Sequence, residues 1–259
     1  MNSPSSPVRD ALFSNPLDKL ASFSFDEQVA RVFPDMIKRS VPGYSQILGM
    51  AGVIARRYVP EGGRVYDLGA SLGAGTLSVA QQLAHLEQLE IIAVDNSQAM
   101  TERCQQLLTE ALPLRPVTTC CADIRTLSYQ PCDLILINFT LQFLPPEDRQ
   151  SLLDRLFAAL RPGGALLLSE KIHFTDPRLS QLLYELHHDF KRANGYSDME
   201  ISQKRTALED VLRTDTAEQH LQRLKDAGFS FSSQWFQYLN FASFLAIKGG
   251  GPGGENESA

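Results

Sequence analysis

Long hydrophobic runs, an excess of positive charge and paired cysteine motifs are all missing from this sequence. No stretch approaches the ~18 apolar residues of a membrane-spanning helix, and the N-terminus has no apolar core of a secretory signal. The formal net charge is −6, which argues against a dominant nucleic-acid-binding surface. We therefore expect a cytoplasmic protein with no membrane contact and no direct contact with nucleic acid.

Cysteine is scarce as well, since only Cys104, Cys120, Cys121 and Cys132 occur among the 259 residues. None of them forms a C-x-x-C pair, so zinc and thioredoxin-like readings have little support. We interpret all four as reduced structural thiols and expect no metal.

A glycine-rich stretch directly after an apolar run is the most informative feature that is present. Residues 64–76 read RVYDLGASLGAGT, and a helical pattern follows. Strand, turn and helix in this order open a nucleotide-binding α/β unit, in which glycine permits unusual backbone angles and a close ligand approach. The motif departs from a clean G-x-G-x-x-G. Asp67 in the strand would be buried, so its carboxylate needs a partner, which N–H groups of the turn could supply.

The same letters match a second motif, because residues 69–73 read G-x-S-x-G, the nucleophile elbow of α/β-hydrolases. Ser71 would then be a nucleophile, with an acid and one of several downstream histidines as its partners. A hydrolase scaffold needs several strands before the elbow, yet the sequence before residue 65 is mostly helical or irregular. No HGGG-type segment occurs. We therefore favour a cofactor-binding turn.

Strand-like and helical segments alternate after this motif, which predicts a mainly parallel sheet with right-handed crossovers. The expected parallel strands are 65–68, 90–95, 117–121, 133–139 and 165–170, and helices at 75–86, 98–110 and 146–160 connect them. Strands at 229–238 and 241–248 should pair as an antiparallel edge hairpin. These segments predict an α/β fold with seven strands.

Other segments surround this alternating core. We expect one helix at 44–58 and, before it, short helical pieces at 25–39 broken near Pro34. Residues 175–213 read as a charged helical insertion, and Thr214 or Asp215 should cap the helix that follows. Residues 1–24 are interpreted as a flexible extension, 25–248 as one α/β domain, and 249–259 as a flexible glycine-rich tail.

Polar residues stand where four predicted strands end. The carboxyl ends of parallel strands share one edge of a sheet, and ligands bind there. Asp95 ends the second strand at a spacing compatible with an acid that binds ribose hydroxyls. Asp123 and the following N–H could read an adenine edge, although Asp123 and Asn138 could equally only cap helices or close turns. The candidates on this edge are Gly69, Ala70, Ser71, Asp95, Asn96, Asp123, Ile124 and Asn138.

This combination resembles the class I S-adenosylmethionine-dependent methyltransferases over about residues 45–248. The shared features are the glycine-rich turn, the acid ending the second strand, the polar pair after the third and the terminal hairpin. The resemblance implies their Rossmann-like fold and S-adenosyl-L-methionine as the cofactor. It leaves the reaction open.

Segments beyond these shared features resemble a narrower family, the carboxy-S-adenosyl-L-methionine synthases, from about Phe25 to Lys248. They read VFPDMI at 32–37, RSVPGY at 39–44, NFTLQF at 138–143, HHDFKRANGYS at 187–197 and EISQKR at 200–205. The resemblance implies synthesis of carboxy-S-adenosyl-L-methionine from S-adenosyl-L-methionine and prephenate. It also implies a homodimer, and a tRNA carboxymethyltransferase that passes the carboxymethyl group to the wobble uridine of tRNA.

The family's cofactor contacts map onto Tyr44, Gly69, Ala70, Ser71, Asp95, Asn96, Asp123, Ile124, Asn138 and Arg205. Ala70 departs from the family, which usually has cysteine there. Arg205 is the distinguishing residue, because a guanidinium can bind the extra carboxylate of the product with two parallel bonds. Without the resemblance Arg205 would read as a surface arginine.

The resemblance implies no protein general base, because the hydroxide that leaves prephenate can take the proton from the activated methyl group. His187, His188 and Asp189 could suggest a metal site, but adjacent histidines on a helix point about 100° apart and rarely share one metal. We therefore favour structural roles, or roles in supporting the residues that contact the ligand. An ordinary small-molecule methyltransferase and a non-catalytic binding protein remain the alternatives.

Overall fold

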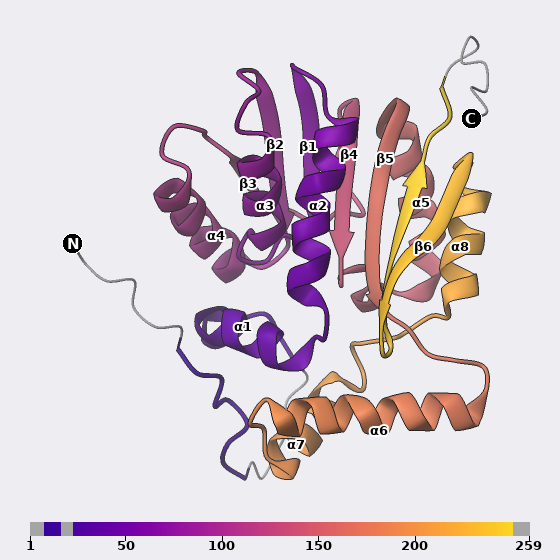
Figure 1. The fold of residues 1–259 in the computed structure, drawn as a ribbon. Helices are drawn as coiled ribbons and strands as arrows, with labels where there is room; N and C mark the ends of the chain where they lie inside the picture. The colour runs from indigo at the N-terminus through magenta and orange to yellow at the C-terminus, as the bar shows by residue number, and fades with distance from the viewer. Residues whose placement is uncertain (1–7, 17–22, 251–259) are drawn as a thin grey trace.

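One seven-stranded sheet forms the centre of the computed structural model, which describes residues 8–16 and 23–250 (Figure 1). The strand order is β3-β2-β1-β4-β5-β7-β6, and β7 runs antiparallel to both β5 and β6 while the other pairs are parallel. This arrangement confirms the predicted fold class. The strands are β1 (Gly63–Leu68), β2 (Leu89–Asp95), β3 (Thr118–Cys121), β4 (Cys132–Asn138), β5 (Leu160–Lys171), β6 (Phe231–Tyr238) and β7 (Phe241–Ile247).

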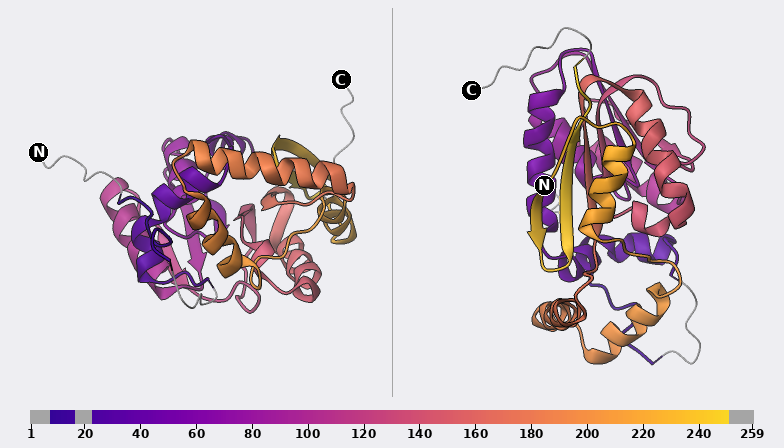
Figure 2. Two further views of the ribbon diagram at one scale, coloured as in Figure 1. Left: turned by 90° about the horizontal axis from the view of Figure 1, so that it is seen from below. Right: turned by 90° about the vertical axis from the view of Figure 1, so that its right-hand side faces the viewer.

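Helices cover both faces of the sheet, so β4 is buried on both sides. Leu134 and Leu136 pack into the cluster on one face, whereas Ile135 and Ile137 pack into the cluster on the other. The right-hand view of Figure 2 shows α2 on one side and α5 and α8 on the other. The bounds are α2 (Tyr44–Tyr58), α3 (Ala74–Gln82), α4 (Gln98–Ala111), α5 (Pro146–Ala159) and α8 (Ala217–Asp226). Within the described ranges, no helix has the length and apolar character to cross a membrane.

Three further helices lie beyond the carboxyl ends of the parallel strands. These are α1 (Glu27–Ser40), α6 (Pro177–Ala193) and α7 (Asp198–Leu208), and Figures 1 and 2 show them across this end of the sheet. Helices α6 and α7 fall within the range expected to form the insertion. The three helices cover the edge of the sheet where the strands end in the predicted ligand-binding residues.

Two local expectations were wrong. Helix α1 continues through Pro34, which is exposed, because the packing of Val29, Phe33 and Met36 outweighs the missing hydrogen bond. Helix α8 is capped by Thr216, which forms a capping box with Gln219. The expected caps, Thr214 and Asp215, precede this position.

The N-terminal segment packs against the insertion where the structure describes it. The Asp10 side chain is 2% exposed and accepts a hydrogen bond from the hydroxyl of Tyr196, and the Lys204 ammonium lies 3.5 Å from it. Arg39 of α1 joins this cluster by donating to the carbonyls of Asp10 and Asn194. Asp10, which lies in the segment expected to be a flexible extension, therefore has buried polar contacts in the structure. The rest of it, at 1–7 and 17–22, and most of the expected tail, at 251–259, lie outside the described residues.

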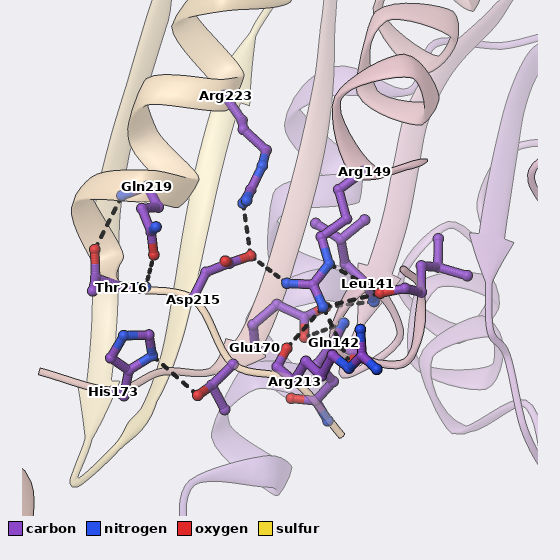
Figure 3. A network of polar contacts seen from close by, with 12 residues as sticks. Leu141, Gln142, Arg149, Glu170, His173, Arg213, Asp215, Thr216, Gln219 and Arg223 are labelled. Atoms are coloured by element: carbon purple, nitrogen blue, oxygen red, sulfur yellow. Dashed lines mark hydrogen bonds and ion pairs between the residues drawn. The ribbon is translucent and has the colours of Figure 1, made fainter. Parts of the chain in front are cut away.

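An ion-pair network fixes the chain where it returns from the insertion (Figure 3). Arg149 of α5 is 1% exposed and pairs with Asp215, which also lies 2.7 Å from Arg223 of α8. The Arg149 guanidinium donates further hydrogen bonds to the carbonyls of Leu144 and Arg213. A buried charge is tolerated only with such partners, so Asp215 holds α5, α8 and the end of the insertion together.

Asp215→Asn removes the negative charge between the two arginines and leaves the buried Arg149 without a counter-charge. We expect the free energy of unfolding, measured by urea denaturation, to fall by about 3 kcal/mol or more. The matched control is Asp189→Asn, because Asp189 pairs with Arg192 on the exposed face of α6. Its urea midpoint should stay close to the wild-type value, and equal shifts in the two variants would contradict the role of Asp215.

Candidate functional site

A cavity of about 300 Å³ lies at the carboxyl edge of the sheet, between the strand ends and the helices α1, α6 and α7. Every predicted cofactor-binding residue except Arg205 lines it. The lining residues from that set are Tyr44, Gly69, Ala70, Ser71, Asp95, Asn96, Asp123, Ile124 and Asn138. The structure therefore brings together residues that lie far apart in the sequence.

The turn after β1 can be built only with glycine at position 69. Gly69 has φ +74°, and a Cβ there would lie 2.0 Å from Oγ1 of Thr140. The N–H groups of Gly69 and Ala70 both donate to the carbonyl of Val94, at 2.8 and 2.9 Å. These bonds tie the turn to the end of β2. The alanine at position 70 thus takes part in the turn through its backbone.

Asp67 has the partner that its burial requires. Its Oδ2 atom accepts hydrogen bonds from the backbone N–H and the hydroxyl of Thr76, at 2.8 and 2.7 Å. Burial raises the pKa of Asp67 to about 6, although the two hydrogen bonds from Thr76 oppose this rise. Asp67 therefore fixes the start of α3 below the turn.

Asp95 holds the turn from the end of β2. One carboxylate oxygen accepts the N–H of Ser71 and the other accepts the N–H of Ser97, both at 2.9 Å. Burial raises its pKa, and the two N–H donors oppose that shift. Each oxygen keeps a lone pair for a further donor, so the carboxylate can still accept hydrogen bonds from ribose hydroxyls.

Ser71 itself is a backbone element of this turn, with φ +50°. Among the hydrogen bonds of the described residues, none joins its hydroxyl to a histidine, so the hydrolase reading gains no support from the geometry.

Asp123 lies on the cavity but is already bonded, which the sequence analysis missed. The Arg125 guanidinium lies 2.6 Å from its carboxylate and 2.8 Å from that of Asp148. The hydrogen bonds from Arg125 lower the pKa of Asp123. Arg125 also lines the cavity. A ligand would therefore meet Asp123 and Arg125 together, as an ion pair.

Asn138 ends β4 with an unused acceptor. Its Oδ1 atom is buried, and among the described residues it has no hydrogen-bond partner. A buried polar atom without a partner is costly, and this one belongs to a cavity-lining residue. A ligand that donates a hydrogen bond, such as the ammonium group of an amino acid, fits this position.

Glu170 of β5 fixes the turn that follows Asn138. Its side chain is fully buried and accepts the N–H groups of Thr140, Leu141 and Gln142, at 3.2, 2.8 and 3.1 Å (Figure 3). These donors open the short 3₁₀ helix η1 (Leu141–Phe143). Burial raises the pKa of Glu170 to about 8, against the effect of the N–H donors. No motif in the sequence indicated this residue.

One wall of the cavity is cationic, which sequence reasoning also missed. Lys171 at the end of β5, Lys191 of α6 and Lys204 of α7 all line the cavity, together with His187. His187 donates from Nε2 to the carbonyl of Ser40, at 2.8 Å, and burial lowers its pKa to about 2. His187 therefore links α6 to α1 as a neutral side chain, a structural contact of the kind expected.

Arg205 does not line this cavity. It is exposed on α7, and its guanidinium carbon lies 5.5 Å from the ring centroid of Tyr184. Its charge nevertheless lowers the pKa of Lys171, whose burial has the larger effect in the same direction. Arg205 thus lies outside the cavity, close to its cationic wall.

Comparisons with known proteins agree with this architecture. A family model described as a methyltransferase domain matches residues 65–164. The apo structure of the S-adenosylmethionine-dependent methyltransferase SibL superposes with a TM-score of 0.61 at 20% identity, covering 86% of this chain and 58% of that longer chain. This likeness shows the fold alone.

Two relatives are much closer in sequence, and both are named carboxy-S-adenosyl-L-methionine synthase. The protein from Enterobacter sp. (strain 638) is 54% identical over 242 residues, which cover 93% of this chain and 98% of that protein. The protein from Chromohalobacter salexigens is 57% identical over 240 residues, which cover 93% and 88%.

Gly69→Ala tests the tight approach of the turn to Thr140. The matched control is Gly62→Ala, because Gly62 has a similar φ of +70° but nothing within 4 Å of an added Cβ. The left-handed backbone should cost each variant about 1 kcal/mol of unfolding free energy, and the clash at Gly69 about 1–3 kcal/mol more.

Only Gly69→Ala should also weaken S-adenosyl-L-methionine binding, by at least tenfold in calorimetric titration. Equal stabilities and equal affinities in the two variants would show that contact with Thr140 does not shape the turn.

Proposed function

Because this chain belongs to the carboxy-S-adenosyl-L-methionine synthase family, we propose that it converts S-adenosyl-L-methionine and prephenate to carboxy-S-adenosyl-L-methionine, phenylpyruvate and water. The name shared by relatives at 54% and 57% identity over nearly the whole chain carries the proposal. Prephenate is the carboxyl donor that the family resemblance implies.

The cavity offers suitable partners for S-adenosyl-L-methionine. The Asp95 carboxylate can accept from the ribose hydroxyls, and the orphaned Oδ1 of Asn138 can accept from the ammonium group of the methionine part. Asp123 with the N–H of Ile124 would meet the adenine. Tyr44, whose ring centroid lies 6.1 Å from that of Phe139, closes the cavity beside the turn.

In the proposed reaction, the base that removes the proton comes from the co-substrate and not from the protein. Prephenate releases carbon dioxide and hydroxide, and its remaining carbon skeleton becomes phenylpyruvate. The hydroxide removes a proton from the methyl group on the sulfonium and forms water. The electron pair left on carbon then attacks the carbon dioxide and forms the new carbon–carbon bond.

In this scheme the protein holds the reactants together and keeps bulk water away. Aromatic side chains line the cavity, and the rings of Phe25 and Phe143 pack edge to face with centroids 5.3 Å apart. Their apolar surface would slow the escape of carbon dioxide and the entry of water. The resemblance assigns no general base to a side chain.

Arg205 would bind the carboxylate that the reaction adds. The exposed position of Arg205 on α7 suits a dimer, which the resemblance also implies. Leu179, Leu182 and Leu186 form an exposed apolar stripe on α6 at helical spacing, and this stripe is our candidate for the interface. The product would serve a tRNA carboxymethyltransferase in the cytoplasm, and the net charge of −6 suits a protein that leaves tRNA to that enzyme.

An ordinary small-molecule methyltransferase is the second candidate. The methyltransferase-domain match over residues 65–164 favours it as much as the proposed synthase, because that region contains the cofactor turn and ends before Arg205 and the cationic side chains.

Purified protein supplied with S-adenosyl-L-methionine and prephenate should release an adenosyl product heavier by one carboxyl group. Mass spectrometry of the released ligand detects it, and phenylpyruvate should appear in equal amount. A reaction without prephenate is the control and should yield unmodified S-adenosyl-L-methionine. If S-adenosyl-L-methionine or its demethylated form is all that appears with prephenate present, the proposal fails.

Arg205→Ala should lower the affinity for carboxy-S-adenosyl-L-methionine about tenfold or more, because it removes charge-assisted bonds to the new carboxylate. Its affinity for S-adenosyl-L-methionine, which lacks that group, should change less than twofold. Arg57→Ala, an exposed arginine on α2, is the matched control and should change neither value in calorimetric titrations. Equal losses for both ligands in Arg205→Ala would contradict the assignment.

A further inference from the structure

Three ammonium groups meet in the cationic wall of the cavity. They come from three separate elements, since Lys171 ends β5, Lys191 lies on α6 and Lys204 lies on α7. Lys191 and Lys204 are only 9% and 6% exposed. Burial lowers the pKa of all three, to about 7 for Lys191 and about 8 for Lys204. Such a cluster is costly unless negative charge lies beside it.

The protein itself supplies partners for one of the three groups. The Lys204 ammonium donates to Oγ of Ser40 at 3.1 Å and lies 3.5 Å from the Asp10 carboxylate. In the described part of the chain, the ammonium groups of Lys171 and Lys191 have neither an ion pair nor a hydrogen bond. Each of these two cations instead adds to the repulsion on its neighbours.

The acidic residues of the cavity lie on another part of the sheet edge. Asp67 lies within β1, Asp95 ends β2 and Asp123 follows β3, whereas Lys171 ends β5. In the strand order, β4 separates the two groups. The acidic part suits the ribose and the cationic cofactor. The lysine part is left for a ligand of negative charge, and two free ammonium groups match a ligand with two carboxylates.

We propose that Lys171 and Lys191 bind the two carboxylates of the co-substrate, prephenate, at a subsite separate from Arg205. The inference rests on the proposed function, because that function supplies a dicarboxylate. Lys204, already paired with Asp10, holds α7 in place beside this subsite. The two negative charges of the co-substrate neutralise the two unpaired ammonium groups, which also accounts for lysine side chains in a largely buried wall.

Lys171→Met and Lys191→Met test the inference, because methionine keeps the length of the side chain and removes its charge. Each variant should raise KM for prephenate by at least tenfold, while the affinity for S-adenosyl-L-methionine changes less than twofold. Lys225→Met, an exposed lysine on α8, is the matched control and should change neither. Retained S-adenosyl-L-methionine binding also shows that each variant is folded.

A binding measurement separates affinity from turnover. Protein saturated with S-adenosylhomocysteine, which has no methyl group to react, is titrated with prephenate in a calorimeter. The wild type should bind prephenate, and both variants should bind it at least tenfold more weakly. Without any ligand, the variants should melt at the same temperature as the wild type or higher, because they lose an unpaired buried charge. A lysine kept for structure would lower the melting temperature instead.

The possible failures are distinguishable. Prephenate turnover by the wild type with an unchanged KM in both variants overturns the subsite and leaves the proposed function standing. An equal loss of S-adenosyl-L-methionine affinity would assign the lysines to the cofactor carboxylate and overturn the subsite as well. If the wild type neither binds nor converts prephenate, the proposed function fails and the inference fails with it.

Discussion

The buried carboxyl group of Glu170 is the contact on which the centre of the cavity depends. By accepting three consecutive N–H groups, it closes the turn after β4 and fixes Thr140 against Gly69. Asn138 precedes this turn, and Lys171 follows Glu170 directly in β5. One interaction between neighbouring parallel strands therefore sets the positions of the glycine-rich turn, the free amide oxygen and the first lysine of the cationic wall.

Much of this architecture could be predicted from the sequence, because the patterns that indicate it are local. The alternation of strands and helices, the turn at Gly69 and the acid at Asp95 depend on residues a few positions apart, and the structure has each of them as predicted. The continuous helix through Pro34 could not be predicted, since tertiary packing determines whether the helix continues past the proline. The cationic wall could not be predicted for a similar reason, because the sequence around Lys171, Lys191 and Lys204 does not show which side chains from other elements will lie beside them. The pairing of Asp123 with Arg125 depends on side-chain geometry that spacing alone does not define.

The cavity combines two electrostatic environments on one sheet edge. Its acids are satisfied by backbone N–H groups and by Arg125, so they act first as parts of the scaffold and then as hydrogen-bond acceptors. Lys171 and Lys191 have no such support within the described chain. In the subsite that we propose, the co-substrate would supply the negative charge that these two lysines lack. Lys171, Lys191 and Arg205 all lie outside residues 65–164, the part of the chain that matches a methyltransferase domain.

The contact between Asp10 and Lys204 spans 194 positions of the sequence. During synthesis, Asp10 leaves the ribosome long before its partners Tyr196 and Lys204 have been made. The glycine-rich turn and its neighbouring strands need no partner so distant along the chain. Since long-range contacts carry the larger loop-closure cost, the nascent chain can assemble its nucleotide-binding half before the wall that would hold the co-substrate has formed.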